Sequence, residues 1–254
     1  MIPIVSDQND WGKLRITGVD RERFLQGMVT NDLAGLAPGA FRRAALLSVK
    51  GRVLAIVDVV VEEESYLVLT EPVTAKKVAD ILERHAIADD VSFEAVSLPL
   101  HRVWRDRAAV WTAPPVFAPA EGAAPPDAVE IRRVEAGYPR YGIDVGEDHF
   151  PFEANLDSII SYTKGCYTGQ EVVARASARG HANKRLRGLR LAAPVAPGTK
   201  LSAEARPEAG SVTSAVVSPE LGPIGLGYVH KSVWEAGTQL RAGDIDVRVV
   251  DLPF

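Results

Sequence analysis

The densest chemistry in the sequence lies in one octapeptide, KGCYTGQE, at residues 164–171. Two glycines flank Cys166, so the backbone can turn sharply there or come close to a ligand. Lys164 lies two residues from the thiol, and a nearby ammonium favours the thiolate, the nucleophilic and metal-binding form of cysteine. Gln170 and Glu171 add an amide and a carboxylate just past the turn. The alternative is a buried structural cysteine in a tight turn, because free cysteine is among the most buried residue types.

The other metal-binding and nucleophilic residue types form no comparable cluster. Cys166 is the single cysteine, which excludes a disulfide within the chain and a cluster held by four thiolates of its own. The histidines show no metal-ligand spacing, so we expect no metal site; they stand at His85, His101, His149, His181 and His230. A histidine at hydrogen-bond distance from the Cys166 sulfur would instead make a Cys–His hydrolase pair.

The composition and the net charge limit the classes of molecule that this protein can be expected to bind. Of the 254 residues, 46% are hydrophobic and 24% are charged, which is ordinary for a globular protein. The net charge of −4 gives no field for gripping a phosphate backbone, so we expect no direct binding of nucleic acid. No apolar run approaches the roughly 20 residues of a membrane span, and the first eleven residues contain no basic, apolar leader. We therefore expect a cytoplasmic protein without membrane contact.

The elements that must position the octapeptide alternate between strands and helices. Asp20 is a typical helix N-cap, and apolar residues follow it at helical spacing up to residue 29. Pro72 opens a second helix. Alternating or continuously apolar runs predict strands, and these cover residues 13–17, 44–49, 53–61, 66–70, 91–96 and 102–111. This order favours an α+β fold, in which helices back an antiparallel sheet.

The second half of the chain changes character twice. Residues 113–128 contain five prolines and little periodicity, which predicts a linker or exposed loop. Short helices are expected over 131–137 and 151–160. From residue 184 onward, short β-rich runs are cut by turns every 8–12 residues, which is typical of a small barrel. We therefore divide the chain into an α+β region at 1–183, with two lobes meeting near 98–128, and a β-barrel domain at 184–254.

The octapeptide fills every fixed position of the KGCYxGQE signature of the YgfZ family, and the chain resembles that family over nearly its whole length. The supporting segments occur in the family's order, at residues 10–11, 24–32, 50–52, 135–139, 153–157, 173–175, 210–215 and 225–229. The family is similar in fold to the tetrahydrofolate-dependent aminomethyltransferase, with two α+β lobes and a C-terminal barrel around a folate pocket. The resemblance implies a folate-binding protein that supports the assembly or repair of iron–sulfur enzymes, including those that modify tRNA.

The resemblance also assigns site residues. It places the chemistry on the octapeptide, at Cys166, Lys164, Tyr167, Gln170 and Glu171. It implies folate contacts from Trp11, Gln26, Asn31, Glu153, Asn155 and Arg175. Trp11 would stack on the pterin, the amides and Glu153 would bind its polar edge, and Arg175 would meet the glutamate tail. We therefore predict that Trp11 and Glu153 line one cavity, and that Cys166 is accessible at its mouth.

Three departures separate this chain from its catalytic relatives. Aminomethyltransferases carry an aspartate just after a Gly-Gly turn, but residues 53–55 are apolar here and Asp58 lies further along. We find no Tyr-Thr-Gly-Glu-like motif in the second lobe, which looks shortened between Trp111 and Asp127. Val129 stands where some relatives place a second pocket tryptophan.

The sequence leaves three functions open. The leading hypothesis is a folate-binding accessory factor with transient iron–sulfur client proteins and no cluster of its own. The alternatives are a tetrahydrofolate-dependent one-carbon transferase and a non-catalytic scaffold for a client protein. Binding of tetrahydrofolate separates the scaffold from the other two, and turnover of an aminomethyl donor separates the transferase from the accessory factor.

Overall fold

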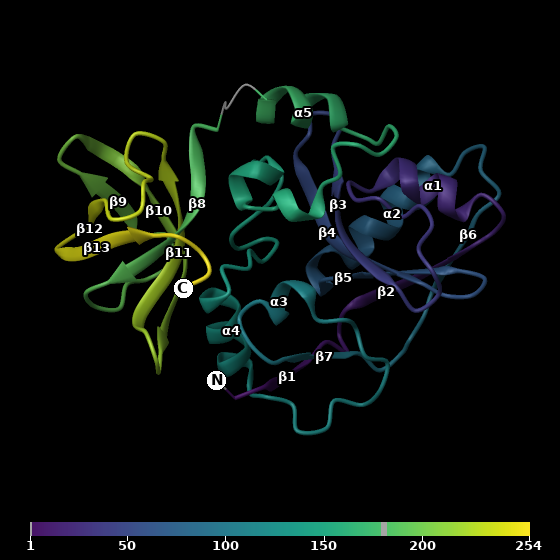
Figure 1. Ribbon diagram of the computed structural model, residues 1–254, viewed down its shortest axis with the longest axis horizontal. Helices are drawn as coiled ribbons and strands as arrows, with labels where there is room; N and C mark the ends of the chain where they lie inside the picture. Colours follow the sequence, from purple (N-terminus) through teal and green to yellow (C-terminus); the bar gives the residue numbers. More distant parts are fainter. Residues whose placement is uncertain (1, 179–181) are drawn as a thin grey trace.

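The computed structural model describes residues 2–178 and 182–254, so His181 lies outside the described part of the chain (Figure 1). The first half forms a five-stranded antiparallel sheet in the order β3-β4-β5-β2-β6. These strands are β2 (Gly12–Thr17), β3 (Phe41–Leu47), β4 (Val53–Val61), β5 (Tyr66–Thr70) and β6 (Ser92–Ala95). Helices α1 (Arg21–Met28) and α2 (Ala75–His85) pack against this sheet, and a 3₁₀ turn, η1 (Pro72–Thr74), leads into α2.

Strand β4 is buried on both faces, which explains why its sequence is apolar except for Asp58. Val57 and Val59 join the cluster that includes Leu25 of α1 and Leu82 of α2. Ile56, on the opposite face, packs in a second cluster with Leu156 and other residues of the 141–173 segment. Because side chains alternate across a strand, one β4 sequence supplies two cores.

The elements in the middle of the chain are short, and two of them differ in extent from the predicted strand at 102–111 and the predicted helix at 131–137. Strand β1 (Ile4–Asp7) pairs with β7 (His101–Trp104), whereas the predicted strand continued to residue 111. Residues Ala109–Thr112 form helix α3 instead, because the Asp106 carboxylate accepts a hydrogen bond from the Ala109 amide (2.9 Å). Helix α4 (Pro126–Glu135) begins five residues before the predicted start, with Pro126 in the first turn, where its missing N–H costs nothing.

The last part of the chain closes into a six-stranded antiparallel barrel in the order β10-β11-β8-β13-β12-β9. Its strands are β8 (Lys184–Leu191), β9 (Lys200–Ala203), β10 (Arg206–Ser218), β11 (Gly222–His230), β12 (Gln239–Ala242) and β13 (Ile245–Val250). The barrel, in light green and yellow in Figure 1, stands beside α4 and the teal segment that precedes α5. The predicted fold class, α+β with antiparallel sheets and a C-terminal barrel, is confirmed.

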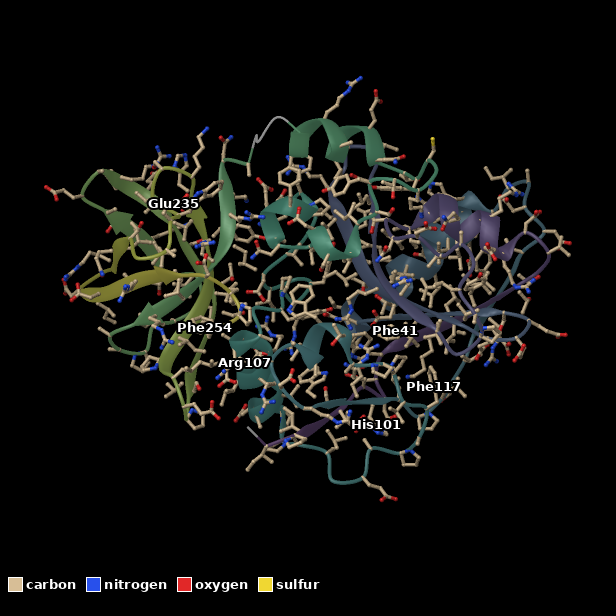
Figure 2. The ribbon with its side chains drawn as sticks, in the orientation of Figure 1. Phe41, His101, Arg107, Phe117, Glu235 and Phe254 are labelled. Atoms are coloured by element: carbon tan, nitrogen blue, oxygen red, sulfur yellow. The ribbon has the colours of Figure 1, made fainter. Side chains whose placement is uncertain are left out.

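A segment of turns joins the sheet to the barrel and carries most of the predicted site. It contains the 3₁₀ helices η2 (Pro151–Ala154) and η3 (Asp157–Ile159), and it ends in helix α5 (Gln170–Ala178). Figure 2 shows the side chains that fill the space between the parts. Among them, Arg107 pairs with Glu135 of α4 (3.4 Å) and with Glu220 of the barrel (3.1 Å). No helix in the described ranges has the length and apolar character needed to cross a membrane.

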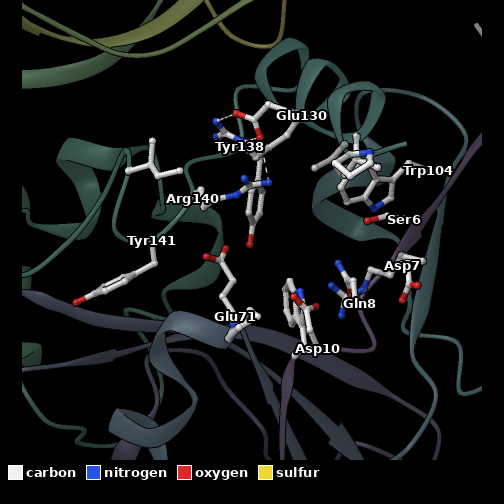
Figure 3. Close-up of a pocket in the computed structure, with 18 of the residues that line it drawn as sticks. Ser6, Asp7, Gln8, Asp10, Glu71, Trp104, Glu130, Tyr138, Arg140 and Tyr141 are labelled. Carbon is white, nitrogen blue, oxygen red and sulfur yellow. Dashed lines mark hydrogen bonds and ion pairs between the residues drawn. The ribbon is translucent and has the colours of Figure 1, made fainter. Parts of the chain in front are cut away.

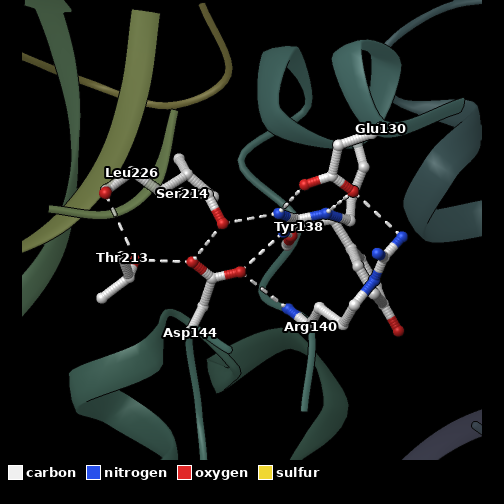
Figure 4. Close-up of polar contacts among 8 residues, drawn as sticks. Glu130, Tyr138, Arg140, Asp144, Thr213, Ser214 and Leu226 are labelled. Atoms are coloured by element: carbon white, nitrogen blue, oxygen red, sulfur yellow. Dashed lines mark hydrogen bonds and ion pairs between the residues drawn. The ribbon is translucent and has the colours of Figure 1, made fainter. Parts of the chain in front are cut away.

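Buried Asp144 fastens the second lobe to the barrel (Figure 4). Its carboxylate accepts hydrogen bonds from Arg133 (2.7 Å), Thr213 (2.5 Å) and Ser214 (2.7 Å). Charge-assisted hydrogen bonds of this kind are the stronger ones in proteins, and Asp144 is fully buried. The barrel is therefore held in place by a specific polar network as well as by apolar packing.

Candidate functional site

The octapeptide is docked onto the end of helix α1. The Lys164 ammonium is 8% exposed and donates hydrogen bonds to the carbonyl oxygens of Val29 (2.9 Å) and Asn31 (2.7 Å). Both carbonyls belong to the extended turn that follows α1, and their hydrogen bonds compensate the ammonium for its loss of water. Burial lowers the pKa of Lys164 to about 8, and the nearby Asp32 carboxylate offsets part of that effect.

Two further residues of the octapeptide fix the loop against the sheet. Gly169 has a φ of +81°, and a Cβ atom at this position would lie 2.5 Å from the Ser48 carbonyl oxygen. Only glycine tolerates both the conformation and the contact. Tyr167 is buried, which raises its pKa to about 12, and the next amide, of Thr168, donates to the Gly27 carbonyl (3.1 Å). The signature therefore describes a loop held at several points.

Within this fixed loop the Cys166 side chain is exposed. Gln170 begins helix α5, and the exposed Glu171 carboxylate pairs with Arg175 one turn later (2.5 Å). No hydrogen bond joins a histidine to Cys166 in the ranges 2–178 and 182–254, so nothing described there supports the Cys–His hydrolase pair.

Gln26 and Asn31 build the turn that receives Lys164. Gln26 donates to the Asp32 carboxylate (2.6 Å) and accepts from the Leu33 amide (2.9 Å). Asn31 donates to the Arg43 carbonyl (2.8 Å) and accepts from the Asp32 amide (2.9 Å). Both amides predicted to contact folate are thus engaged within the protein, and the structure brings them together with the octapeptide.

Glu153 and Asn155 are engaged at the junction with the barrel. The Glu153 carboxylate accepts from the Phe150 amide (2.9 Å) and lies 3.7 Å from the Arg52 guanidinium. Asn155, in the left-handed region with a φ of 57°, donates to the Leu186 carbonyl (2.8 Å) and accepts from Arg185 (3.1 Å). Neither residue lines the cavity that contains Trp11.

That cavity measures about 790 Å³, which suits a ligand of folate size (Figure 3). Trp11 lines it, as does Val129, the position at which some relatives carry a second tryptophan. Trp104 of β7 also lines it and supplies an aromatic surface that Val129 lacks. Glu153 is not among the lining residues, so the prediction that Trp11 and Glu153 share one cavity is wrong. Glu153 is turned instead into the loop that begins at Phe150.

Three buried polar atoms on the wall of this cavity lack a hydrogen-bond partner among the described residues. They are one acceptor, Gln8 Oε1, and two donors, Arg102 Nε and Trp104 Nε1. Each residue is at most 6% exposed. An unmet buried polar group costs about 1–3 kcal/mol, so a polar ligand or ordered water that offers both donors and acceptors would be stabilised at this wall.

Two arginines on one wall of the cavity, Arg43 and Arg102, belong to a buried ion cluster, whereas the lining as a whole carries both signs of charge. The buried Asp58 carboxylate accepts from Arg43 (2.8 and 3.1 Å) and from Arg102 (2.6 Å), so two guanidinium groups share one carboxylate. Burial by itself would raise the pKa of Asp58, but Arg102 and Arg43 outweigh it and lower the pKa. The Asp58 carboxylate is therefore engaged in a structural ion cluster, and both of its arginine partners line the cavity.

Glu71 and Tyr138 point toward each other across the cavity in Figure 3, the first from the sheet and the second from the segment after α4. Burial raises the pKa of Glu71 to about 7, although Arg140 and Arg133 pull it back. Burial likewise raises the pKa of Tyr138 to about 12. Near neutral pH, Glu71 can thus donate a hydrogen bond when protonated or accept one when ionised.

Comparison with known proteins identifies the relatives of this chain. Residues 4–103 match the model of the GCVT N-terminal domain, and residues 184–254 match that of the glycine cleavage T-protein C-terminal barrel domain. The chain belongs to the glycine cleavage T-protein family. Within it, the chain is 24% identical to the tRNA-modifying protein YgfZ of Aliivibrio fischeri, covering 91% of this chain and 90% of that protein.

Two further relatives of this protein are named aminomethyltransferases. The chain is 34% identical over 185 residues to an aminomethyltransferase of Saccharopolyspora erythraea, which covers 68% of this chain but only 48% of that protein. The crystal structure of the glycine cleavage system aminomethyltransferase T from Bartonella henselae superposes with a TM-score of 0.84 at 18% identity, covering 99% of this chain and 86% of that one. This likeness establishes the fold.

Sequence reasoning missed most of the cavity of this family member. Gln8, Glu71, Arg102, Trp104 and Tyr138 were not predicted as site residues. One signal was available: Arg43 and Arg102 each lie in an apolar, strand-like run, where an arginine is costly unless it is paired. Asp58 is the carboxylate that pairs with both arginines. From the sequence alone, Asp58 was considered only because it lies beyond the position of the catalytic aspartate in aminomethyltransferases. Among the described residues, no group of three or more potential metal ligands comes together.

Proposed function

We propose that this protein is a tetrahydrofolate-binding accessory factor that supports the assembly or repair of iron–sulfur proteins. The observation that carries the folate part is the cavity at Trp11, with its three unmet buried polar atoms. Membership of the T-protein family, whose members typically bind folate, supports the same assignment, and the name of the Aliivibrio fischeri relative, a tRNA-modifying protein, supports a link to tRNA modification. The iron–sulfur role rests on the octapeptide and its exposed cysteine.

The residues of the cavity fit a folate. Trp11 and Trp104 offer flat apolar walls for a pterin ring, which stacks on aromatic side chains as nucleic acid bases do. Gln8 Oε1 and the N–H groups of Arg102 and Trp104 complement the mixed donors and acceptors of the pterin edge. Arg140, which is partly exposed and pairs with Glu130 (3.0 Å), offers a guanidinium group to the carboxylates of the glutamate tail. Bound tetrahydrofolate would supply a carrier of one-carbon units.

The structure argues against the transferase alternative at one point. Asp58 is the sole aspartate in strand β4, and its carboxylate is held by Arg43 and Arg102. Breaking that pair would leave two buried guanidinium groups without a counter-charge, which costs several kcal/mol. Asp58 is thus not available as a free carboxylate for an aminomethyl donor.

Cys166 would act at the surface, in contact with a client protein. The thiol is exposed on a loop that Lys164, Tyr167 and Gly169 hold in place. A rigid loop presents a nucleophile or a transient metal ligand at one fixed position, which reduces the ordering cost of a protein encounter. Because the chain has one cysteine, a cluster on this thiol would need ligands from the client.

The test separates the two halves of the proposal. Cells that lack the protein are complemented with wild type, Cys166→Ala or Trp11→Ala, and the activities of iron–sulfur enzymes are measured. We expect Cys166→Ala to abolish complementation while the purified variant still binds tetrahydrofolate, and Trp11→Ala to weaken both. Full complementation by Cys166→Ala would return the cysteine to a structural role. Aminomethyl transfer by the purified protein would favour the transferase instead.

A further inference from the structure

A second cavity lies between the barrel and the loop that carries His149, and no part of it has been assigned a role. It measures about 620 Å³ and shares no lining residue with the cavity at Trp11. Its walls come from β8 to β11, including Lys184, Lys200, Ser211 and Tyr228. The two cavities are therefore separate features of the molecule.

The Tyr228 hydroxyl is the first sign of a ligand here. The side chain is 5% exposed, and its oxygen has no hydrogen-bond partner among the described residues. Burial raises the pKa of Tyr228 well above its ordinary value, so the hydroxyl keeps its proton and remains a donor. A buried hydroxyl without a partner is unfavourable, and a ligand that accepts its hydrogen bond would remove that cost.

His149 adds a second donor beside it. The imidazole stacks on the Tyr228 ring, with centroids 4.4 Å apart and planes 21° apart. Its Nδ1 accepts a hydrogen bond from the Gly146 amide (3.2 Å), so the hydrogen of the neutral ring resides on Nε2. Burial, with help from the charge of Lys184, lowers the pKa of His149 to about 4. At neutral pH the ring is therefore an uncharged N–H donor.

The charges of the cavity complete the pattern. Lys184 lies with its Nζ 4.9 Å from the centre of the Tyr228 ring, and Lys200 lines the same cavity. Glu208 is the carboxylate among the lining residues, so two ammonium groups face one carboxylate. Among the lining residues positive charge thus outnumbers negative charge, which favours an anionic ligand, and the carboxylates of Asp144 and Glu153 lie beyond the lining on the side of the Tyr228 hydroxyl.

We propose that this barrel cavity binds the oxyanion group of a small molecule, a phosphate or a carboxylate, with Tyr228, His149 and Lys184 as its principal contacts. The Tyr228 hydroxyl and the His149 Nε2–H donate to the oxygens, and the Lys184 ammonium supplies the counter-charge. The proposal concerns a site separate from the folate cavity and does not depend on folate binding.

The test is a titration of the ¹⁵N-labelled full-length protein, followed through the amide signals of Gly210 and Ser211. Sodium phosphate and sodium acetate are added in separate arms, with sodium chloride at matched ionic strength as the reference. We expect saturable shifts with at least one anion, and the stronger arm identifies the class of oxyanion. Lys184→Gln and Tyr228→Phe should each weaken that binding about tenfold, the loss of roughly one charge-assisted hydrogen bond.

Lys231→Gln is the matched control, because Lys231 is an exposed lysine just past the end of β11 that does not line the cavity. It should leave the affinity unchanged. The proposal fails if neither anion gives saturable shifts, or if Lys231→Gln weakens binding as much as Lys184→Gln. Displacement of the anion by tetrahydrofolate would also overturn it, since the cavity would then belong to the folate site. Lys184→Gln gives the decisive comparison if Tyr228→Phe does not fold.

Discussion

Replacement of Lys164 by methionine tests whether this residue anchors the cysteine loop or acts on the thiol directly. Lys164→Met keeps the apolar stem and removes the two hydrogen bonds to the carbonyls of Val29 and Asn31. Hydrogen bonds to charged groups contribute about 1.5–3 kcal/mol each. The ammonium is costly to bury, as its lowered pKa indicates, and the variant regains that part. Two such bonds total about 3–6 kcal/mol and the lowered pKa, from 10.5 to about 8, returns about 3 kcal/mol, so the net loss should be about 1 kcal/mol.

For a protein of this size that loss corresponds to a fall in Tm of about 2–4 °C. Urea unfolding followed by circular dichroism measures the free energy, and alkylation of Cys166 at several pH values measures the thiol in the folded protein. Lys50→Met is the matched control, since Lys50 is an exposed lysine on the neighbouring β3–β4 turn, and its effect should stay within about 0.5 kcal/mol. Unchanged stability together with slower alkylation in Lys164→Met would refute the anchoring role and favour direct tuning of the thiol.

Three further substitutions test other parts of the account. Gly169→Ala should destabilise the protein by about 2–4 kcal/mol in thermal unfolding, because of its positive φ and the contact with a carbonyl oxygen, whereas Gly165→Ala should be tolerated, since its Cβ would meet nothing within 4 Å. Asp58→Asn should cost about 3–5 kcal/mol in urea unfolding, because two buried guanidinium groups lose their counter-charge. Glu71 has a pKa raised from 4.5 to about 7, so its contribution to stability is fully present below pH 4.5 and is lost as the pH rises through 7. Glu71→Gln should therefore gain up to about 3 kcal/mol relative to wild type between pH 5 and pH 8, and parallel urea midpoints over that range would contradict the assignment.

The parts of the fold that sequence could predict are those set by local pattern. Alternation and turn residues located the strands of the sheet and the barrel, because side chains on a strand alternate between its faces. The extent of β7 was missed because the prediction continued the strand through three consecutive charged residues, Arg105, Asp106 and Arg107, at which the strand ends. Asp106 caps a short helix there, and that local bond outweighs the apolar pattern.

The candidate site was harder to predict because its polar residues are defined by distant partners. Lys164 was correctly singled out, but its acceptors lie 135 and 133 residues away, at the end of α1. Gln26, Asn31 and Glu153 have the residue types of ligand contacts, and in the structure they bond to main-chain groups or to neighbouring side chains. Sequence shows which side chains can donate or accept, and the fold decides whether a partner within the protein is already in reach.

Tetrahydrofolate binding, measured by isothermal titration calorimetry, tests the central claim most directly. The account predicts saturable one-site binding to wild type that Trp11→Ala weakens at least about tenfold, since stacking on an aromatic side chain contributes about 1–3 kcal/mol. Trp234→Ala, in the barrel and outside the cavity, is the control and should bind as wild type does. Absence of binding to the wild-type protein, or equal binding by Trp11→Ala, would contradict the account.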